Sequence, residues 1–314
     1  MPAWNPDKDI PSLASKVILI TGGTAGLGSG SISELAKHAP AHIIFTGRNQ
    51  QSADALIKKQ STATPNVKVT FIRCDISSFA SIATASDEIL AQISRLDIVM
   101  LNAGIMAVDA AVSVDGYEIQ MMTNHLGHAL LIRRLLPILQ QTATTHGDAR
   151  VVNLTSVAYT QAPKLGIDFA TLKTPQENQG GLIPGGKYSR YGQSKLAQLF
   201  YSAGLATHYP EITSLPVHPG VIQTALLTEL DFLSKIPMMF FTKTPVEQGH
   251  WQQCWAATVD KREVKNGAYY EPVGQLVEMQ KRKTRQSKDE GLSRRLWEWT
   301  EQQLDAFEAK SGRL

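Results

Sequence analysis

The stretch Thr21-Gly22-Gly23-Thr24-Ala25-Gly26-Leu27-Gly28 decides the fold. It follows the apolar run Lys16–Thr21 and leads into a helical pattern over Leu27–His38. Its glycines allow a tight turn, and the helix that follows presents free N–H groups and the positive end of its dipole. A turn of this kind between a buried strand and a helix predicts a site for the pyrophosphate of a dinucleotide.

The rest of the chain repeats the alternation of short apolar runs with longer amphipathic ones. Strand-sized runs are Lys16–Thr21, His42–Thr46, Val67–Ile72, Asp97–Leu101, Arg150–Leu154 and Ser214–His218. Helical patterns are Leu27–His38, Ala53–Gln60, Phe79–Ile93, Tyr117–Gln140 and Ser189–His208. Nearly continuous apolar runs are typical of parallel strands covered on both faces. We therefore predict an α/β fold with a doubly wound parallel sheet (Rossmann fold), as a single domain over residues 1–314.

Three segments depart from this rhythm. Residues 159–187 are rich in Gly and Pro, and residues 220–245 contain the apolar cluster Pro237–Phe241 (PMMFF). Both are longer than ordinary connections, which predicts substrate loops or lids. A C-terminal amphipathic helix is expected over residues 289–308, clearest in Glu290–Phe307. Its apolar side chains would pack on the core or on a partner subunit: Leu292, Leu296, Trp299 and Leu304.

Composition excludes several classes of function. The 314 residues carry 31 basic and 28 acidic side chains, a net charge of +3 that is too balanced to favour nucleic acid. Two cysteines, Cys74 and Cys254, cannot form a disulfide framework and lack metal-ligand spacing, so no metal site is expected. There is no signal-peptide pattern and no run of about 18 apolar residues, so we expect no membrane span and a cytoplasmic location.

The second strand ends next to Arg48, which lies 20 residues beyond Gly28. Sites for NAD place an Asp or Glu about 20 residues beyond the glycines, where it binds the ribose 2′-hydroxyl. A guanidinium pairs instead with a 2′-phosphate, so Arg48 predicts NADP(H), although it could also be an ordinary surface arginine. Asp75, after the third strand, is placed either to contact the adenine or to cap the next helix.

Further motifs follow in a fixed order along the chain. They are Asn102-Ala103-Gly104, Asn124, Ser156, Tyr191-Gly-Gln-Ser-Lys195 and Pro219-Gly220. Together with Thr21–Gly28 they resemble the short-chain dehydrogenase/reductase family over about residues 15–225. The sequences at Asn124–His128 and Tyr191–Ala197 are similar to the retinol dehydrogenase and WW-domain oxidoreductase branch. Ser156 and Tyr191 are 35 residues apart, farther than in many family members, and that branch carries a comparable insertion.

Tyr191 and Lys195 are four residues apart on a predicted helix and so share a face. A phenol ionises near pH ~10, and a neighbouring ammonium is expected to lower the pKa of Tyr191 toward a useful range. Ser156, at the carboxyl end of a parallel strand, can hydrogen-bond a substrate oxygen. The resemblance implies that Lys195 also holds the nicotinamide ribose and that Asn124 keeps a water in a proton relay. Asn124 could otherwise mark a helix kink or a satisfied core amide.

The resemblance also implies further contacts with the cofactor. Asn102 and Gly104 would line the cleft, and Thr224 would contact the nicotinamide carboxamide or cap the following segment. The full set of predicted cofactor-binding residues is Thr21, Gly22, Thr24, Gly26, Leu27, Gly28, Arg48, Asp75, Asn102, Gly104, Tyr191, Lys195, Pro219, Gly220, Val221 and Thr224. His125 and His128 could ligate a metal, but no third ligand is apparent.

These residues predict an NADP(H)-dependent oxidoreductase that interconverts a carbonyl and an alcohol, with Asn124, Ser156, Tyr191 and Lys195 as its catalytic residues. The cluster Pro237–Phe241 favours a hydrophobic small-molecule substrate. The resemblance implies a possible homodimer or tetramer through the helices that hold Asn124 and Tyr191. Two alternatives stay open: a non-enzymatic dinucleotide-binding regulator, and an epimerase or dehydratase that retains its nucleotide.

Overall fold

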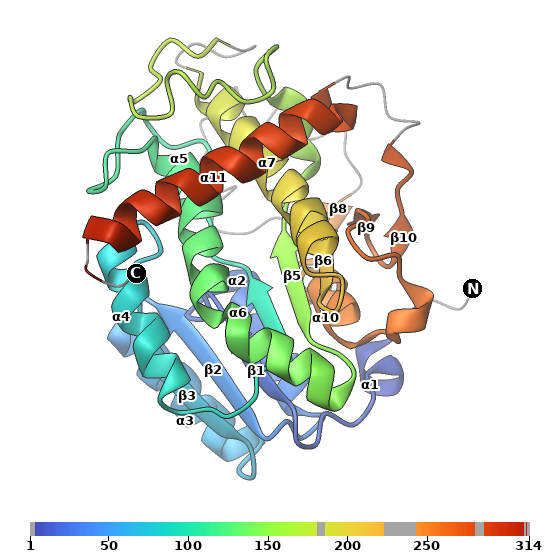
Figure 1. Cartoon of the computed structure of the whole chain (residues 1–314). Coiled ribbons are helices and arrows are strands. Elements are labelled where there is room, and N and C mark those ends of the chain that lie inside the picture. Colours follow the sequence, from blue (N-terminus) through green and yellow to red (C-terminus); the bar gives the residue numbers. More distant parts are fainter. Residues whose placement is uncertain (1–3, 181–185, 223–242, 280–285, 311, 313–314) are drawn as a thin grey trace.

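The computed structural model describes residues 4–180, 186–222, 243–279, 286–310 and 312, and it confirms the predicted doubly wound fold (Figure 1). Eight strands form one sheet in the order β10-β9-β6-β5-β4-β1-β2-β3. Seven of them are parallel neighbours, and β10 pairs with β9 in the antiparallel sense. The strands are β1 Val17–Ile20, β2 His42–Gly47, β3 Lys68–Arg73, β4 Ile98–Leu101, β5 Arg150–Leu154, β6 Thr213–Val217, β9 Tyr270–Glu271 and β10 Gln275–Leu276.

Helices cover both faces of this sheet, and each face has its own apolar core. One core joins the sheet to α4, α6 and α7, and the other joins it to α2, α3 and α10. The helices are α1 Pro6–Asp9, α2 Gly26–Ala36, α3 Gln50–Ala63, α4 Phe79–Leu90, α5 Ile119–Met121, α6 Gly127–His146, α7 Lys187–His208, α10 Trp251–Thr258 and α11 Glu290–Lys310. Among the residues described, none of the helices combines the length and the apolar character that a membrane span requires.

The helix expected over Tyr117–Gln140 is interrupted. A π-helical turn, η1 (Met122–Leu126), separates α5 from α6, and the Gly127 N–H donates to the Met122 carbonyl five residues earlier. The sequence pattern also missed α10 and the short strands β9 and β10. It placed the six central strands within about two residues of their observed bounds.

The two predicted loops differ in how much of them is described. After the short helix η2 (Val157–Gln161), residues 162–180 run without helix or strand. Of the segment 220–245, the ends form the short strands β7 (Val221–Ile222) and β8 (Lys243–Thr244), which pair with each other. Pro237–Phe241 and Thr224 lie outside the described residues. The substrate-loop roles stay predictions.

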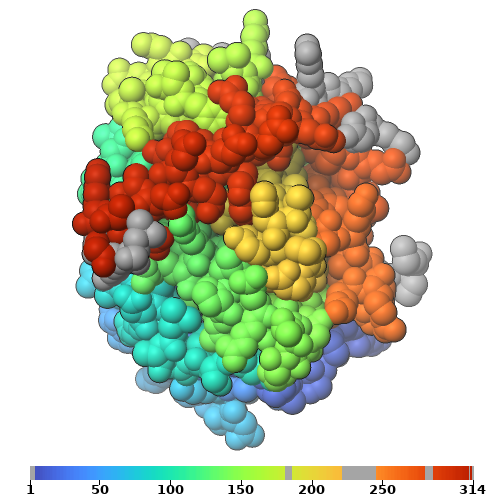
Figure 2. All heavy atoms as spheres, viewed as in Figure 1, coloured from blue at the N-terminus to red at the C-terminus, as the bar shows by residue number. Residues whose placement is uncertain are grey.

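The predicted C-terminal helix is present as α11. It lies across α6 and α7 (Figure 1), and its atoms form a band between the 162–180 segment and α6 (Figure 2). Leu292, Leu296 and Leu304 are buried against the rest of this chain, which is the core-packing alternative of the prediction. Trp297 stacks on Tyr201 of α7, with 5.4 Å between ring centroids.

Candidate active site

The predicted site residues gather at the carboxyl ends of the central strands. Thr21 follows β1, Asn102 follows β4, Ser156 follows β5 by two residues, and Pro219 follows β6 by two residues. The chain order of the strands reverses between β4 and β1. Doubly wound sheets open a crevice for ligands at such a reversal, outside the carboxyl ends of the strands.

The glycine turn has the geometry of an anion cradle. Gly22 and Gly26 have φ values of +66° and +56°, which favour glycine. A β-carbon on Gly28 would stand 2.4 Å from the Gly22 carbonyl oxygen, so α2 can approach the turn only with glycine there. No side chain caps α2 at Ala25, which leaves the first N–H groups of the helix available to a phosphate. These features fit the pyrophosphate of a dinucleotide.

Thr24 brings the turn to the end of β2. A β-carbon on Gly47 would lie 2.8 Å from the Thr24 methyl carbon, so the two residues are in close contact. Arg48 follows Gly47 and is exposed. Within the described part of the chain, Arg48 has no hydrogen bond or ion pair to another residue, so its guanidinium is available beside the turn. Leu27 lies in the first turn of α2, where its carbonyl accepts from Gln253 at 3.3 Å.

Asp75 does not cap the following helix. The N-cap of α4 is Ser78, whose hydroxyl accepts from the Ser81 N–H. Asp75 accepts instead from the Ser77 N–H at 3.0 Å and from the Ser77 hydroxyl at 2.6 Å. The capping alternative is therefore wrong, because a serine nearer to the helix takes that position. Contact with an adenine stays a prediction.

Ser156, Tyr191 and Lys195 come together, as the helical spacing predicted for Tyr191 and Lys195 and as the family resemblance implied for Ser156. A side-chain hydrogen bond joins Tyr191 to Ser156, and the Lys195 Nζ lies 5.5 Å from the centroid of the Tyr191 ring. The close approach of α7 to η2 depends on Gly192, whose β-carbon would stand 2.6 Å from the Ala158 carbonyl oxygen. Tyr191 as a whole residue keeps partial exposure.

The protonation of this pair differs from the sequence-based expectation. Burial raises the pKa of Tyr191 to about 12, and the hydrogen bond with Ser156 only partly offsets this effect. Burial lowers the pKa of Lys195 to about 7. The expected lowering of the Tyr191 pKa by Lys195 is not observed: burial dominates, and the neighbour that lowers the pKa is Ser156. Tyr191 is therefore a protonated phenol at neutral pH.

Lys195 is held by α7 and β5. Its ammonium donates to the Leu154 carbonyl at 2.9 Å and to the Gln198 Oε1 at 2.7 Å. Gln198 in turn donates to the Asn153 side chain at 2.9 Å. Sequence analysis missed Gln198, although its position three residues after Lys195 places both side chains on one helical face.

Asn124 lies in the π-helical turn and is fully buried. Its side chain accepts from the Ile105 N–H at 2.9 Å and donates to the Ile105 carbonyl at 3.0 Å and the Ser194 hydroxyl at 2.8 Å. A β-carbon on Gly104 would lie 3.1 Å from the Asn124 Oδ1 and 3.8 Å from the Lys195 Nζ, so these groups converge beside Gly104. Asn124 is thus a satisfied core amide at a helix distortion, and its role in a proton relay stays a prediction.

The remaining predicted cofactor residues lie on several different elements around the crevice. The Thr21 side chain is fully buried beneath the crevice, where its hydroxyl accepts from the N–H groups of Asn102 and Ala103. Asn102 donates to the Thr21 carbonyl at 2.8 Å. Pro219 and Gly220 follow β6, and Gly220 has a φ of +94°. Val221 begins β7.

The two histidines of the Asn124–His128 motif are bound to other side chains. The His125 Nε2 lies 2.8 Å from the Thr300 hydroxyl of α11, and the His128 Nε2 lies 2.9 Å from the Thr21 hydroxyl. Over the described ranges, no three His, Cys, Asp or Glu side chains gather as metal ligands would.

Gln253 of α10 is a second residue that sequence analysis missed. Its amide donates to the Ser31 hydroxyl and, at 3.4 Å, to the Asn102 Oδ1. It therefore joins α10 to both sides of the crevice. No local signal singles it out, because it is one of two adjacent glutamines in an unpredicted helix.

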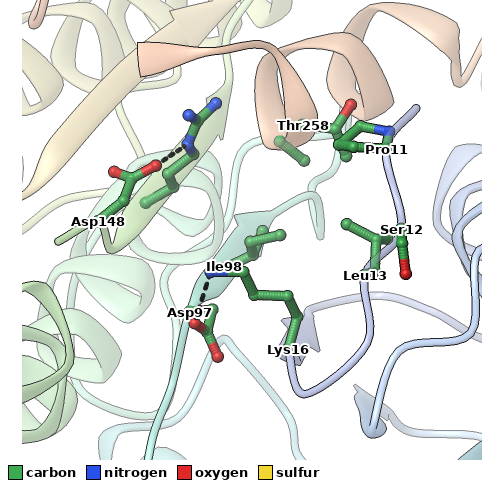
Figure 3. Close-up of a pocket in the computed structure, with 10 residues that line it drawn as sticks. Pro11, Ser12, Leu13, Lys16, Asp97, Ile98, Asp148 and Thr258 are labelled. Carbon is green, nitrogen blue, oxygen red and sulfur yellow. Dashed lines mark hydrogen bonds and ion pairs between the residues drawn. The ribbon is translucent and has the colours of Figure 1, made fainter. Parts of the chain in front are cut away.

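A small cavity of about 100 Å³ lies at the amino ends of the strands, at the end of the sheet opposite the candidate active site (Figure 3). Its charged walls are already paired: Lys16 with Asp97 at 3.1 Å, and Arg150 with Asp148 at 2.8 Å. These residues stand at the amino ends of strands, away from Ser156 and Tyr191. The cavity is therefore separate from the candidate active site.

Comparison with known proteins agrees with this site. A family model described as short chain dehydrogenase matches residues 16–174. An uncharacterized oxidoreductase of Schizosaccharomyces pombe is 36% identical over 87% of this chain and 81% of its own length. A short-chain dehydrogenase/reductase of Aspergillus calidoustus, drtF, is 33% identical over 94% of this chain and 95% of its own.

A crystal structure of an uncharacterized protein from Mycobacterium paratuberculosis has a TM-score of 0.73 and 28% identity, over 96% of this chain and 98% of that one. The similarity therefore extends well beyond the residues that the family model matches. It includes the segment that holds Tyr191 and Lys195. With the fold and the motif order in agreement, the chain belongs to the short-chain dehydrogenase/reductase family of oxidoreductases.

Proposed function

We propose that this protein is an NADP(H)-dependent reductase that converts a carbonyl group, in a ketone or aldehyde, to an alcohol. The observation that carries the proposal is the meeting of Ser156, Tyr191 and Lys195 beside a glycine turn that fits a dinucleotide. The exposed Arg48 supports the preference for NADP(H), because its guanidinium is free to pair with a 2′-phosphate.

The reaction needs a hydride and a proton. When bound, the reduced nicotinamide supplies the hydride to the carbonyl carbon. The Ser156 hydroxyl donates a hydrogen bond to the carbonyl oxygen, where negative charge develops. The Tyr191 hydroxyl then gives its proton to that oxygen. Because the pKa of Tyr191 is about 12, the phenol carries this proton throughout the neutral range, as the acid of the reduction step must.

Lys195 restores the proton to Tyr191 in this proposal. Its pKa of about 7 lets it gain and lose a proton readily near neutral pH. Asn124 would hold a water that connects Lys195 to solvent. This role is supported by the convergence of Asn124 and Lys195 at Gly104.

A hydrophobic substrate is proposed from the cluster Pro237–Phe241 and from the length of the 159–187 and 220–245 segments. The cytoplasmic location and the oligomeric state stay predictions.

The test is oxidation of NADPH and of NADH, followed by absorbance, across a panel of aliphatic, aromatic, steroid-like and retinoid-like carbonyls. We expect turnover with NADPH on apolar members, and Tyr191→Phe should abolish it while NADPH binding changes little. Substantial activity in Tyr191→Phe would show the assignment to be wrong. Stoichiometric NADPH binding without turnover would favour the regulator, and a nucleotide that co-purifies and is not consumed would favour the epimerase or dehydratase.

A further inference from the structure

His128 makes two hydrogen bonds that the proposed reaction does not use. It lies in the first turn of α6, directly after the π-helical turn, and is 1% exposed. Its Nδ1 is 3.0 Å from the Asn124 carbonyl oxygen, and its Nε2 is 2.9 Å from the Thr21 hydroxyl oxygen. The ring thus spans from the helix of the catalytic site to the strand that enters the glycine turn.

In a neutral ring, only one placement of the protons satisfies both bonds. A carbonyl oxygen can only accept, so the His128 Nδ1 must carry a hydrogen and donate it to Asn124. The Nε2 of a neutral ring is then an acceptor, and the Thr21 hydroxyl donates to it. Burial lowers the pKa of His128 to about 4, which agrees with a neutral ring at neutral pH.

The Thr21 hydroxyl extends the chain of bonds to the far wall of the crevice. With its hydrogen directed to His128 at 2.9 Å and not to the more distant Met100 carbonyl at 3.4 Å, its lone pairs accept from the Asn102 N–H at 2.9 Å and the Ala103 N–H at 3.0 Å. The Asn102 side chain then donates to the Thr21 carbonyl and, at 3.2 Å, to the Gly22 carbonyl. A buried hydroxyl with all its partners in place fixes the relative position of these segments.

We propose that His128 is a positioning residue that couples the nucleotide-binding turn, through Thr21, to the π-helical turn that holds Asn124. The inference rests on the proposed function and extends it. Loss of the bond to Thr21 loosens the end of β1 and the Asn102 segment, and so weakens nucleotide binding. Loss of the bond to Asn124 releases the π-helical turn next to Lys195, and so slows turnover.

Two amide variants separate these effects. In His128→Asn, the side-chain N–H stands near the position of Nδ1, so the bond to Asn124 survives and the bond to Thr21 is lost. In His128→Gln, the amide reaches the position of Nε2, so its oxygen can accept from Thr21 and the bond to Asn124 is lost. Thr21→Val removes the hydroxyl at nearly constant volume, and Thr21→Ser restores it.

We expect His128→Asn to weaken mainly nucleotide binding and His128→Gln to slow mainly turnover. His128→Asn should raise the Kd for NADPH, measured by its fluorescence, about tenfold, as loss of a buried bond does. His128→Gln should keep that Kd within about threefold while kcat falls about tenfold. Thr21→Ser should bind like wild type. In the double variant Thr21→Val/His128→Asn, the Kd should be no higher than in Thr21→Val alone, because Thr21→Val already removes the bond that His128→Asn breaks.

The matched control is His125→Gln, which alters the neighbouring histidine and its bond to Thr300 but not the path to Thr21. It should leave the Kd for NADPH unchanged. If His128 had a purely structural role, both amide variants would lose thermal stability equally. His128→Asn would then not act mainly on Kd, and His128→Gln would not act mainly on kcat. That result, or additive effects in the double variant, would overturn the proposal.

Failure of the proposed function is distinguishable from failure of the coupling. If wild type binds NADPH but reduces no carbonyl, the function is wrong, and the Kd measurements still decide the coupling to the turn. Amide hydrogen exchange adds a readout that needs no nucleotide. His128→Asn, but not His125→Gln, should speed exchange in the peptide over residues 99–106, which contains the Asn102 and Ala103 N–H groups. Unchanged exchange there would contradict the coupling.

Discussion

Gly192 lies so close to Ala158 that a β-carbon on residue 192 would stand 2.6 Å from the Ala158 carbonyl oxygen. This contact holds α7 against η2, and with it Tyr191 against Ser156. Gly192→Ala should therefore push the two apart and lower kcat by roughly 100-fold, since small displacements in a catalytic site have effects of that size. Steady-state kinetics would measure the loss, and NADPH binding should change little.

Gly204→Ala is the matched control for this prediction. It makes the same change on the same helix, but its β-carbon would meet the Trp297 ring of α11 at 2.4 Å instead of η2. It should cost about 1–3 kcal/mol of stability from overpacking and leave kcat nearly intact. Equal losses of kcat in both variants would mean that Gly192 has no special relation to Ser156.

Arg48 provides a test of cofactor preference. Arg48→Glu should raise the Kd for NADPH about 10- to 100-fold, because charge-assisted hydrogen bonds contribute about 1.5–3 kcal/mol and a carboxylate also repels a phosphate. NADH, which lacks the 2′-phosphate, should bind equally well or better. Lys68→Glu makes the same charge reversal on an exposed residue that begins β3, at the edge of the sheet away from the crevice, and should shift neither Kd. Parallel losses for NADPH and NADH would contradict this role of Arg48.

The burial of His125 predicts that the free energy of unfolding decreases at acidic pH. Burial lowers its pKa from 6.5 to about 3 in the folded state, whereas the unfolded chain binds a proton below pH 6.5. Because the unfolded state then binds more protons, each pH unit below 6.5 removes up to about 1.4 kcal/mol of the free energy of unfolding. Urea unfolding at pH 7 and pH 5 should show a smaller loss for His125→Gln than for wild type. Equal losses in the two proteins would mean that His125 is already charged when folded.

The apolar runs predicted the strands β1, β4, β5 and β6 well because each is buried along its whole length. β5 occupies Arg150–Leu154, as expected, and its five residues are all buried. The shorter strands β9 and β10 have two residues each and form through pairing with distant segments, which no local pattern shows. The helix α10 was missed for a related reason, because its Gln252 and Gln253 look like surface residues but are buried and hydrogen-bonded.

The candidate site was predictable in its members but not in its electrostatics. Motif order and helical spacing predicted that Ser156, Tyr191 and Lys195 would meet. The pKa of Tyr191 depends instead on how much water the folded chain removes from it, which is a property of tertiary packing. A helix kink at Asn124 was one alternative from the sequence, but its π-helical form was not predicted, since the residues around it keep the apolar spacing of a regular α-helix.

Two residues of α11 hydrogen-bond to the region before α6: Thr300 to His125 in the π-helical turn, and Gln303 to the Tyr117 hydroxyl. The helix α11 follows every strand of the sheet in the chain. A ribosome that has reached residue 289 has therefore made the whole glycine turn and the Ser156–Tyr191–Lys195 group, but not the partner of His125. In a growing polypeptide, the glycine turn and the Ser156–Tyr191–Lys195 group are thus synthesised before the residue that hydrogen-bonds to His125.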